Sequence, residues 1–127
     1  RIGDHAENFH EIGLEMIDRK ISFSDQAREG IMTMRDTVMQ MFVISKDTFE
    51  NLDREKLSEL TRLEESVDDM KKELISGHFS RLAEGNCSID VSPYYSSVIV
   101  GLERVADHLV NVGYSIVNPT GSQKENY

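Results

Sequence analysis

The chain has 127 residues, with 14 Lys and Arg against 23 Asp and Glu, so its net charge is −9. This length suits one domain, while the acidic balance disfavours a nucleic-acid partner, which requires basic side chains, and direct binding to anionic lipid. No segment approaches the roughly 20 apolar residues of a spanning helix, and the single cysteine, Cys87, excludes an internal disulfide and a thiolate metal site.

Apolar residues recur at steps of three and four along most of the chain, which predicts an all-α protein. A first amphipathic helix is expected from the N-terminus to about Arg19. Its apolar stripe is Ile2, Ala6, Phe9, Gly13 and Met16. Because the sequence opens inside a motif and without Met, we interpret its N-terminus as a cut end.

The second helix is predicted to begin after Ser24, whose hydroxyl can cap it, and to end near Asn51. Polar Ser45 interrupts its apolar seam. The seam consists of Ala27, Ile31, Met34, Val38, Met41, Phe49 and Leu52. For the four methionines of this helix, at 32, 34, 39 and 41, gap filling in a core or interface is preferred to a promiscuous binding surface.

A tight connection near Asp53 precedes a third helix that fades near Gly85, a residue suited to the left-handed position after a helix. Its stripe is Leu57, Leu60, Leu63, Val67, Met70 and Leu74. After a short loop, a fourth helix is expected to start at Ser92 and Pro93 and to end at Asn118. Its inner face is Val98, Leu102, Ala106, Leu109, Gly113 and Ile116.

Short connections force neighbouring helices to run antiparallel. The predicted fold is therefore an up-down three-helix bundle over residues 24–118, with one extra N-terminal helix in residues 1–23 and a polar tail in residues 119–127.

One motif occurs twice. Arg, Asp, His and Asn of RIGDHAEN (1–8) recur in register in RVADHLVN (104–111), at a constant offset of 103. Such repetition suggests duplicated helical units, of which the first is represented only by its last helix.

In the second copy, Glu103, Asp107 and Asn111 step by four and share one stripe of the helix. Glu64 and Asp68 form a matching pair on the third helix, with residues 65 and 69 as an alternative register. Like charges at this spacing destabilise a helix by about 0.2–0.5 kcal/mol per pair. They invite a compensating cation, which predicts a carboxylate metal site between helices. The alternative for the third-helix pair is a solvated acidic face.

The other repeated residues fit ligand roles less well. His5 and His108 each adjoin an aspartate and point about 100 degrees away from it around the helix. They are expected to be interface or hydrogen-bonding residues rather than metal ligands. Arg104 is expected either to bridge acidic neighbours or to be solvated.

These segments resemble a known family. RIGDHAEN (1–8) and ERVADHLVN (103–111) resemble the two copies of the Glu/Asp-x-x-x-Asp signature of PhoU-like proteins, and EESVD (64–68) resembles the partner signature on the preceding helix. The resemblance implies one complete three-helix repeat in residues 24–118, after the last helix of a truncated repeat in residues 1–23. It also implies multinuclear metal clusters, commonly of iron or zinc. Glu64, Asp68, Glu103 and Asp107 are then candidate ligands, and Asp4 belongs to the site of the other repeat.

The resemblance further implies a bacterial, non-enzymatic regulator of phosphate uptake. In this family the domain stands alone or is fused behind the membrane part of sodium/phosphate cotransporter-like proteins, and this sequence resembles the fused type. We therefore expect a soluble domain on the cytoplasmic side of the cell membrane, with the transport domain of its parent chain as partner. Oxygen ligands also suit manganese or magnesium.

Phe9 and Met16 are expected to face solvent unless a homo-oligomer buries them. Two alternatives stay open. A ferritin-like di-iron enzyme would need Glu-x-x-His on two helices, and only Glu7 to His10 matches. A purely structural oligomerisation bundle would satisfy the apolar periodicity alone.

Overall fold

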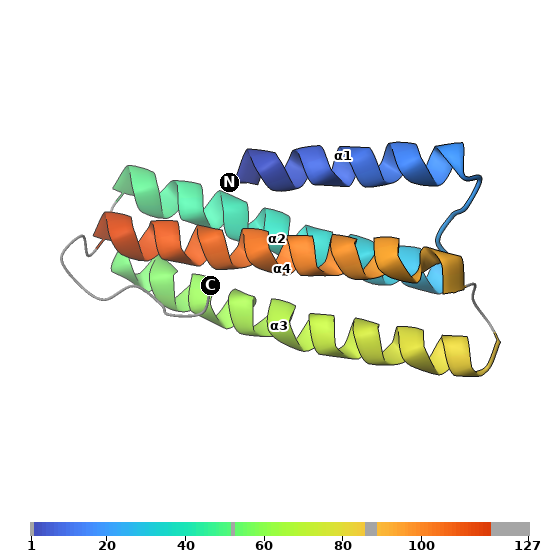
Figure 1. Ribbon diagram of the computed structural model, residues 1–127. Coiled ribbons are helices and arrows are strands. Elements are labelled where there is room, and N and C mark those ends of the chain that lie inside the picture. Colours follow the sequence, from blue (N-terminus) through green and yellow to red (C-terminus); the bar gives the residue numbers. More distant parts are fainter. Residues whose placement is uncertain (1, 52, 86–88, 118–127) are drawn as a thin grey trace.

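Four α-helices and one 3-10 turn make up the part of the chain that the computed structural model describes, residues 2–51, 53–85 and 89–117. The elements are α1 (Ile2–Asp18), α2 (Asp25–Asn51), α3 (Arg54–Ala83), η1 (Ile89–Val91) and α4 (Ser92–Val117). Figure 1 shows α2, α3 and α4 as long rods that alternate in direction, with α1 alongside. The predicted all-α, up-down bundle is confirmed. The predicted tail, residues 119–127, lies outside the described residues.

Capping residues begin and end the long helices, and those at Ser24 and Gly85 were predicted. The Oγ of Ser24 accepts a hydrogen bond from the Ala27 N–H at 3.2 Å before α2, and the Asp53 carboxylate accepts from the Glu55 N–H at 3.0 Å before α3. Gly85 adopts φ +76° after α3, a conformation that glycine reaches without a Cβ clash. Gly85 therefore lets the chain turn sharply where α3 ends. None of the described helices is both long and apolar enough to cross a bilayer.

Helix α1 ends without a glycine. Lys20 adopts φ +57°, and the N–H groups of Lys20 and Ile21 donate to the carbonyls of Ile17 and Met16 at 3.1 and 3.0 Å. This pair of bonds is the Schellman arrangement, which satisfies carbonyls that the last helical turn leaves free. A left-handed conformation costs a non-glycine residue about 1–2 kcal/mol, so the connection to α2 stores some strain.

The main core lies between α2, α3 and α4, each of which contacts the other two. Its most deeply buried apolar side chains are Met34, Met41, Leu60, Val67, Tyr95, Ile99, Ala106 and Val110. The predicted stripes of α3 and α4 are confirmed within the described side chains. Each large aliphatic side chain contributes about 1.5–3 kcal/mol when it leaves water, so this seam is the main source of stability.

The predicted seam of α2 is wrong near its end. Phe49 is 63% exposed, while Ile44, Ser45 and Thr48 are buried. Thr48 tolerates burial because its hydroxyl donates to the Ile44 carbonyl at 3.0 Å. Leu52 lies outside the described residues. Among the methionines, those at 34 and 41 are in the core, as predicted, whereas those at 32 and 39 are exposed.

Helix α1 packs on α4 and extends the core. Ile12 and Met16 form a second buried cluster with Tyr94, whose hydroxyl accepts a hydrogen bond from Arg19 at 2.7 Å. Ala6, which the predicted stripe includes, is exposed, whereas Ile12, which the stripe omits, is buried.

The expectation that Phe9 and Met16 face solvent is wrong. Met16 is 7% exposed, and Phe9 packs against the main core. The reason is that α4 already covers this face of α1. These two side chains therefore give no ground for a homo-oligomer.

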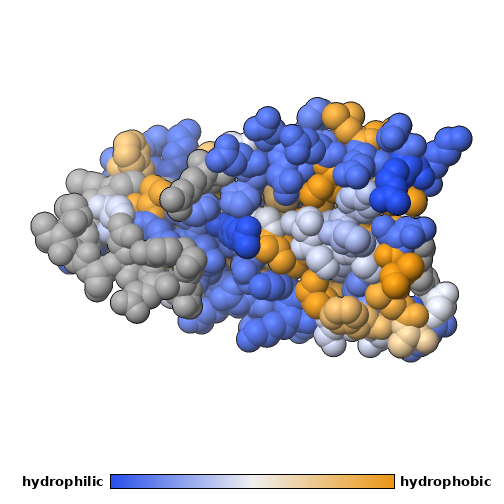
Figure 2. Space-filling model, viewed as in Figure 1, coloured by the Kyte–Doolittle hydropathy of each residue, from blue (hydrophilic) through white to orange (hydrophobic). Residues whose placement is uncertain are grey.

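Figure 2 shows a mostly hydrophilic face with apolar side chains gathered over the end of the bundle where α3 ends and α4 begins. In this part of the chain Phe79 is 63% and Ile89 74% exposed. On this face the apolar side chains are therefore concentrated at one end of the bundle.

We expect Gly101→Ala to loosen α1 from α4. A Cβ at Gly101 would lie 2.6 Å from Cε1 of Phe9, and overpacking of this kind costs about 1–3 kcal/mol. Gly13→Ala is the control, because its Cβ would meet nothing within 4 Å and a helical alanine gains about 0.5–1 kcal/mol over glycine. Urea unfolding of both variants measures the difference, and a Gly101→Ala chain at least as stable as Gly13→Ala would contradict the packing.

Candidate metal centre

The acidic stripes of α3 and α4 meet at the seam between these helices. Asp68 of α3 shares a hydrogen bond with Glu103 of α4, and Asp107 lies in the field of both acids. The alternative register is exposed, since Glu65 and Asp69 face solvent. The register that faces the bundle is therefore the one that contains Glu64 and Asp68.

Burial and crowding change the acidity of this cluster. Partial burial, with the charges of Asp68 and Glu103, raises the pKa of Asp107 from 3.8 to about 6. Partial burial, with the charge of Glu103 and the hydrogen bond to it, also raises the pKa of Asp68. Both raised pKa values mean that the negative charges of the seam repel one another and are only partly solvated.

Lys71 supplies the nearest positive charge. Its Nζ lies 3.1 Å from both carboxylate oxygens of Glu103, and its charge acts to lower the pKa of Asp68 and of Asp107. The sequence analysis missed this residue. Its signal is the spacing, because Lys71 follows Asp68 by three residues and so lies on the same face of α3.

The structure brings together three of the five predicted ligands, Asp68, Glu103 and Asp107. Glu64 lies one turn before Asp68 on α3 and is only 1% exposed. Asp4 lies exposed on α1 and is not among the charges that shift the pKa of Asp68 or Asp107. The predicted set is thus divided into a cluster, a buried neighbour and a separate surface acid.

The donor atoms of the cluster suit a cation in their chemistry. Asn111, the next member of the α4 stripe, has a buried Oδ1 with no hydrogen-bond partner in the described part of the chain, and an orphaned buried oxygen requires an explanation. Over residues 2–51, 53–85 and 89–117, however, no three His, Cys, Asp or Glu side chains converge as metal ligands. The oxygen donors are therefore of the kind that hard or borderline metal ions prefer. In this structure the ammonium group of Lys71 is the positive charge that contacts them.

The two copies of the repeated motif also meet. The rings of His5 on α1 and His108 on α4 lie 5.6 Å apart at an interplanar angle of 36°. Helices α1 and α4 run antiparallel (Figure 1), and this pair of histidines brings the two copies of the motif into contact. Both histidines are interface residues, as predicted. Glu7 and His10, the only di-iron match, are both exposed.

The helical bundle, its carboxylate seam and the motif that occurs twice place the chain in a class of acidic, all-α domains. Residues 31–116 match the PhoU domain, and the chain belongs to the PhoU family.

Among curated proteins, the chain is similar to the phosphate-specific transport system accessory protein PhoU homolog 1 of Thermotoga maritima, with 27% identity over 120 residues. The alignment covers 92% of this chain and 50% of that protein, so the chain spans about half the length of the relative. No solved structure gives a significant match.

Asp107 should make the chain less stable as pH rises. Its pKa in the folded chain is about 6 against an ordinary 3.8, so between these values the folded state binds more protons than the unfolded state. The free energy of unfolding therefore falls with rising pH in this window. In Asp107→Asn this loss should disappear, which leaves the variant more stable than the parent at pH 7 by on the order of 1 kcal/mol after allowance for solvent screening.

Urea unfolding between pH 4 and pH 7 in the presence of a chelator measures this effect, with exposed Asp69→Asn as the matched control. Parallel pH profiles for the parent chain and Asp107→Asn would show that Asp107 is not crowded.

Proposed function

We propose that this chain is a metal-binding regulatory domain that controls phosphate uptake and has no catalytic activity of its own. The observation that carries the proposal is the crowded seam, in which Asp68, Glu103 and Asp107 gather beside the unpartnered oxygen of Asn111. Membership of the PhoU family supports a regulatory role, and the similar Thermotoga protein is named as an accessory protein of phosphate-specific transport.

Asp68, Glu103 and Asp107 would hold the ion, with Glu64 and Asn111 beside them. A bound cation would neutralise the seam, and oxygen donors suit iron, manganese or magnesium, with zinc as a further candidate. Lys71 would have to leave the Glu103 carboxylate, which it contacts at 3.1 Å. The metal ion would thus replace the ammonium group of Lys71 beside Glu103. Because Lys71 belongs to α3 and Glu103 to α4, ion binding would change a contact between these two helices.

In this proposal residues 24–118 are one complete repeat, and residues 1–23 are the last helix of another repeat that contains Asp4. The parent is a bacterial sodium/phosphate cotransporter-like protein, whose membrane transport domain is the partner. The domain lies on the cytoplasmic side of the cell membrane and forms a homo-oligomer. The exposed Phe49, Phe79 and Ile89 offer apolar surface for such contacts.

Metal should raise the melting temperature of the chain, because an ion that binds only the folded state stabilises it by mass action. Glu103→Gln should weaken this response, while Glu50→Gln, a change at an exposed acid of α2, should leave it intact. Lys71→Gln should strengthen the response, because it removes the competing ammonium group, and exposed Lys46→Gln is its control.

Thermal melts with and without manganese, zinc or iron, together with elemental analysis of the purified chain, test the site. If metal raised the melting temperatures of Glu103→Gln and Glu50→Gln equally, the acidic stripe would be a solvated face and not a metal site.

Protease digestion of oriented membrane vesicles that carry the intact parent tests the location. We expect cleavage within this segment only when the cytoplasmic face is accessible, because the acidic domain would project from that face. Cleavage only from the external face would contradict the cytoplasmic location.

A further inference from the structure

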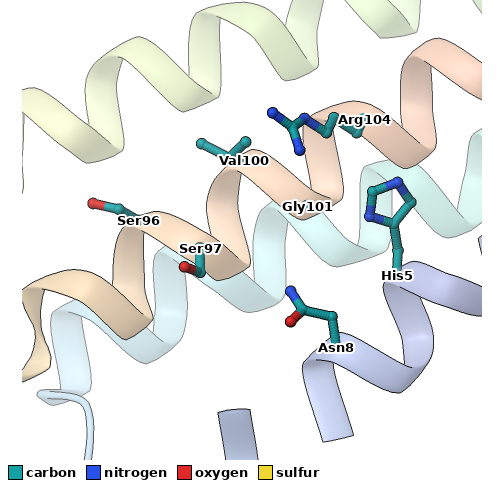
Figure 3. A pocket seen from close by; sticks show the side chains of 7 residues that line it. All are labelled: His5, Asn8, Ser96, Ser97, Val100, Gly101 and Arg104. Carbon is teal, nitrogen blue, oxygen red and sulfur yellow. The ribbon is translucent and has the colours of Figure 1, made fainter. Parts of the chain in front are cut away.

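The repeated motif also contributes residues to a groove between α1 and α4 that the carboxylate cluster does not use. Figure 3 shows His5 and Asn8 projecting from α1 toward α4, and Ser96, Ser97 and Arg104 line the α4 side of the groove, with the Arg104 side chain directed along α4 toward Val100. Two of these side chains come from the first copy of the motif and Arg104 comes from the second. The groove therefore combines the non-acidic polar residues of both copies.

The size of the groove restricts its ligand. Its volume is about 250 Å³, below the roughly 300–1,000 Å³ typical of pockets for organic ligands. It exceeds the roughly 30 Å³ share of one water molecule. Gly101 lies on its α4 wall. The space suits a small ion with part of its hydration shell.

The chemistry of the walls favours an anion. Arg104, His5, Asn8, Ser96 and Ser97 can all donate hydrogen bonds, and no carboxylate lines the groove. Such a lining is unexpected in a chain of net charge −9. A guanidinium presents several donors in a planar fork that matches the oxygens of phosphate and similar ions.

These donors are free to bind a ligand. Arg104 is exposed and makes no hydrogen bond or ion pair with the described residues, so the bridge to acidic neighbours is not formed. Nor do the side chains of Asn8, Ser96 and Ser97 form hydrogen bonds within that part of the chain. The contact of His5 with the ring of His108 fixes one wall.

We propose that this groove binds a small tetrahedral oxyanion, inorganic phosphate, between Arg104 of α4 and the polar side chains of α1. The relevance of such a site to uptake rests on the proposed function, whereas the binding itself does not. The groove is lined by none of Asp68, Glu103 and Asp107, so metal and phosphate would occupy separate but neighbouring sites on α4.

The surrounding acids give the site a characteristic response. Asp4 precedes His5, and Asp107 follows Arg104 by three residues, so both place negative charge near the groove. Coulomb repulsion from an exposed acid at short range weakens anion binding modestly. Removal of the Asp4 charge should therefore tighten phosphate binding.

Isothermal titration of the 127-residue chain with inorganic phosphate, in chelator and at constant ionic strength set with chloride, tests the site. We expect saturable binding at one site, at least about tenfold weaker in Arg104→Gln, because a charge-assisted hydrogen bond is lost. The matched control, Arg62→Gln, removes an exposed arginine of α3 outside the groove and should bind like the parent. Asp4→Asn should bind about two- to threefold more tightly.

Competition identifies the kind of ligand. Displacement of phosphate by sulfate but not by chloride supports an oxyanion site. Absence of saturable binding at millimolar phosphate, equal affinities of Arg104→Gln and Arg62→Gln, or equal displacement by chloride would overturn the site. Circular dichroism melts of each variant show that a lost affinity does not reflect a lost fold.

The two proposals fail separately. Phosphate binding in chelator by a chain that shows no response to metal would remove the metal function and support the groove. A normal metal response with no phosphate binding would overturn the groove alone.

Discussion

Helix α4 contacts α1, α2 and α3, and its sequence has to satisfy all three neighbours at once. Its apolar face enters the core, with Tyr95 and Ile99 fully buried. Its acidic stripe meets α3 through Glu103, and toward α1 it has Gly101, where a Cβ would meet Phe9. Since successive residues of a helix turn by about 100 degrees, each surface is fixed by a separate set of positions. The core, the acidic seam and the groove all depend on the rotation of this one helix.

The acidic seam lowers the stability of the folded chain. Carboxylates beside an apolar core are partly desolvated, which is costly unless a cation or a proton compensates. Here one lysine, Lys71, pairs with Glu103, while the pKa of Asp107 remains raised to about 6. A seam that was fully neutralised within the chain would have little affinity for an external cation. The incomplete compensation is what makes a binding role physically reasonable.

The helices could be predicted from the sequence because aliphatic residues such as Leu60 and Val67 recur at helical spacing, and the capping residues are short-range signals. Positions near helix ends were less predictable. Phe49 is apolar but exposed, since the buried position next to it is taken by Thr48, whose hydroxyl bonds within its own helix.

The inward acidic register, Glu64 with Asp68, was one of two registers that the sequence allowed, and it is the one that the structure fully or partly buries next to the apolar stripe. The pairing of Lys71 with Glu103 joins residues that are 32 positions apart, and it depends on how two helices are rotated against each other. Periodicity along a single helix does not contain that information. The groove between α1 and α4 depends on the same kind of inter-helix alignment.

The position of α1 has a consequence for the order of folding. Helices α2, α3 and α4 follow one another through short connections, so their contacts close small loops. The contact of His5 with His108 joins the two ends of the described chain, and closing a long loop costs more conformational entropy. The three-helix hairpin assembly should therefore form first and α1 should dock last, which makes the groove one of the last features of the native state to appear.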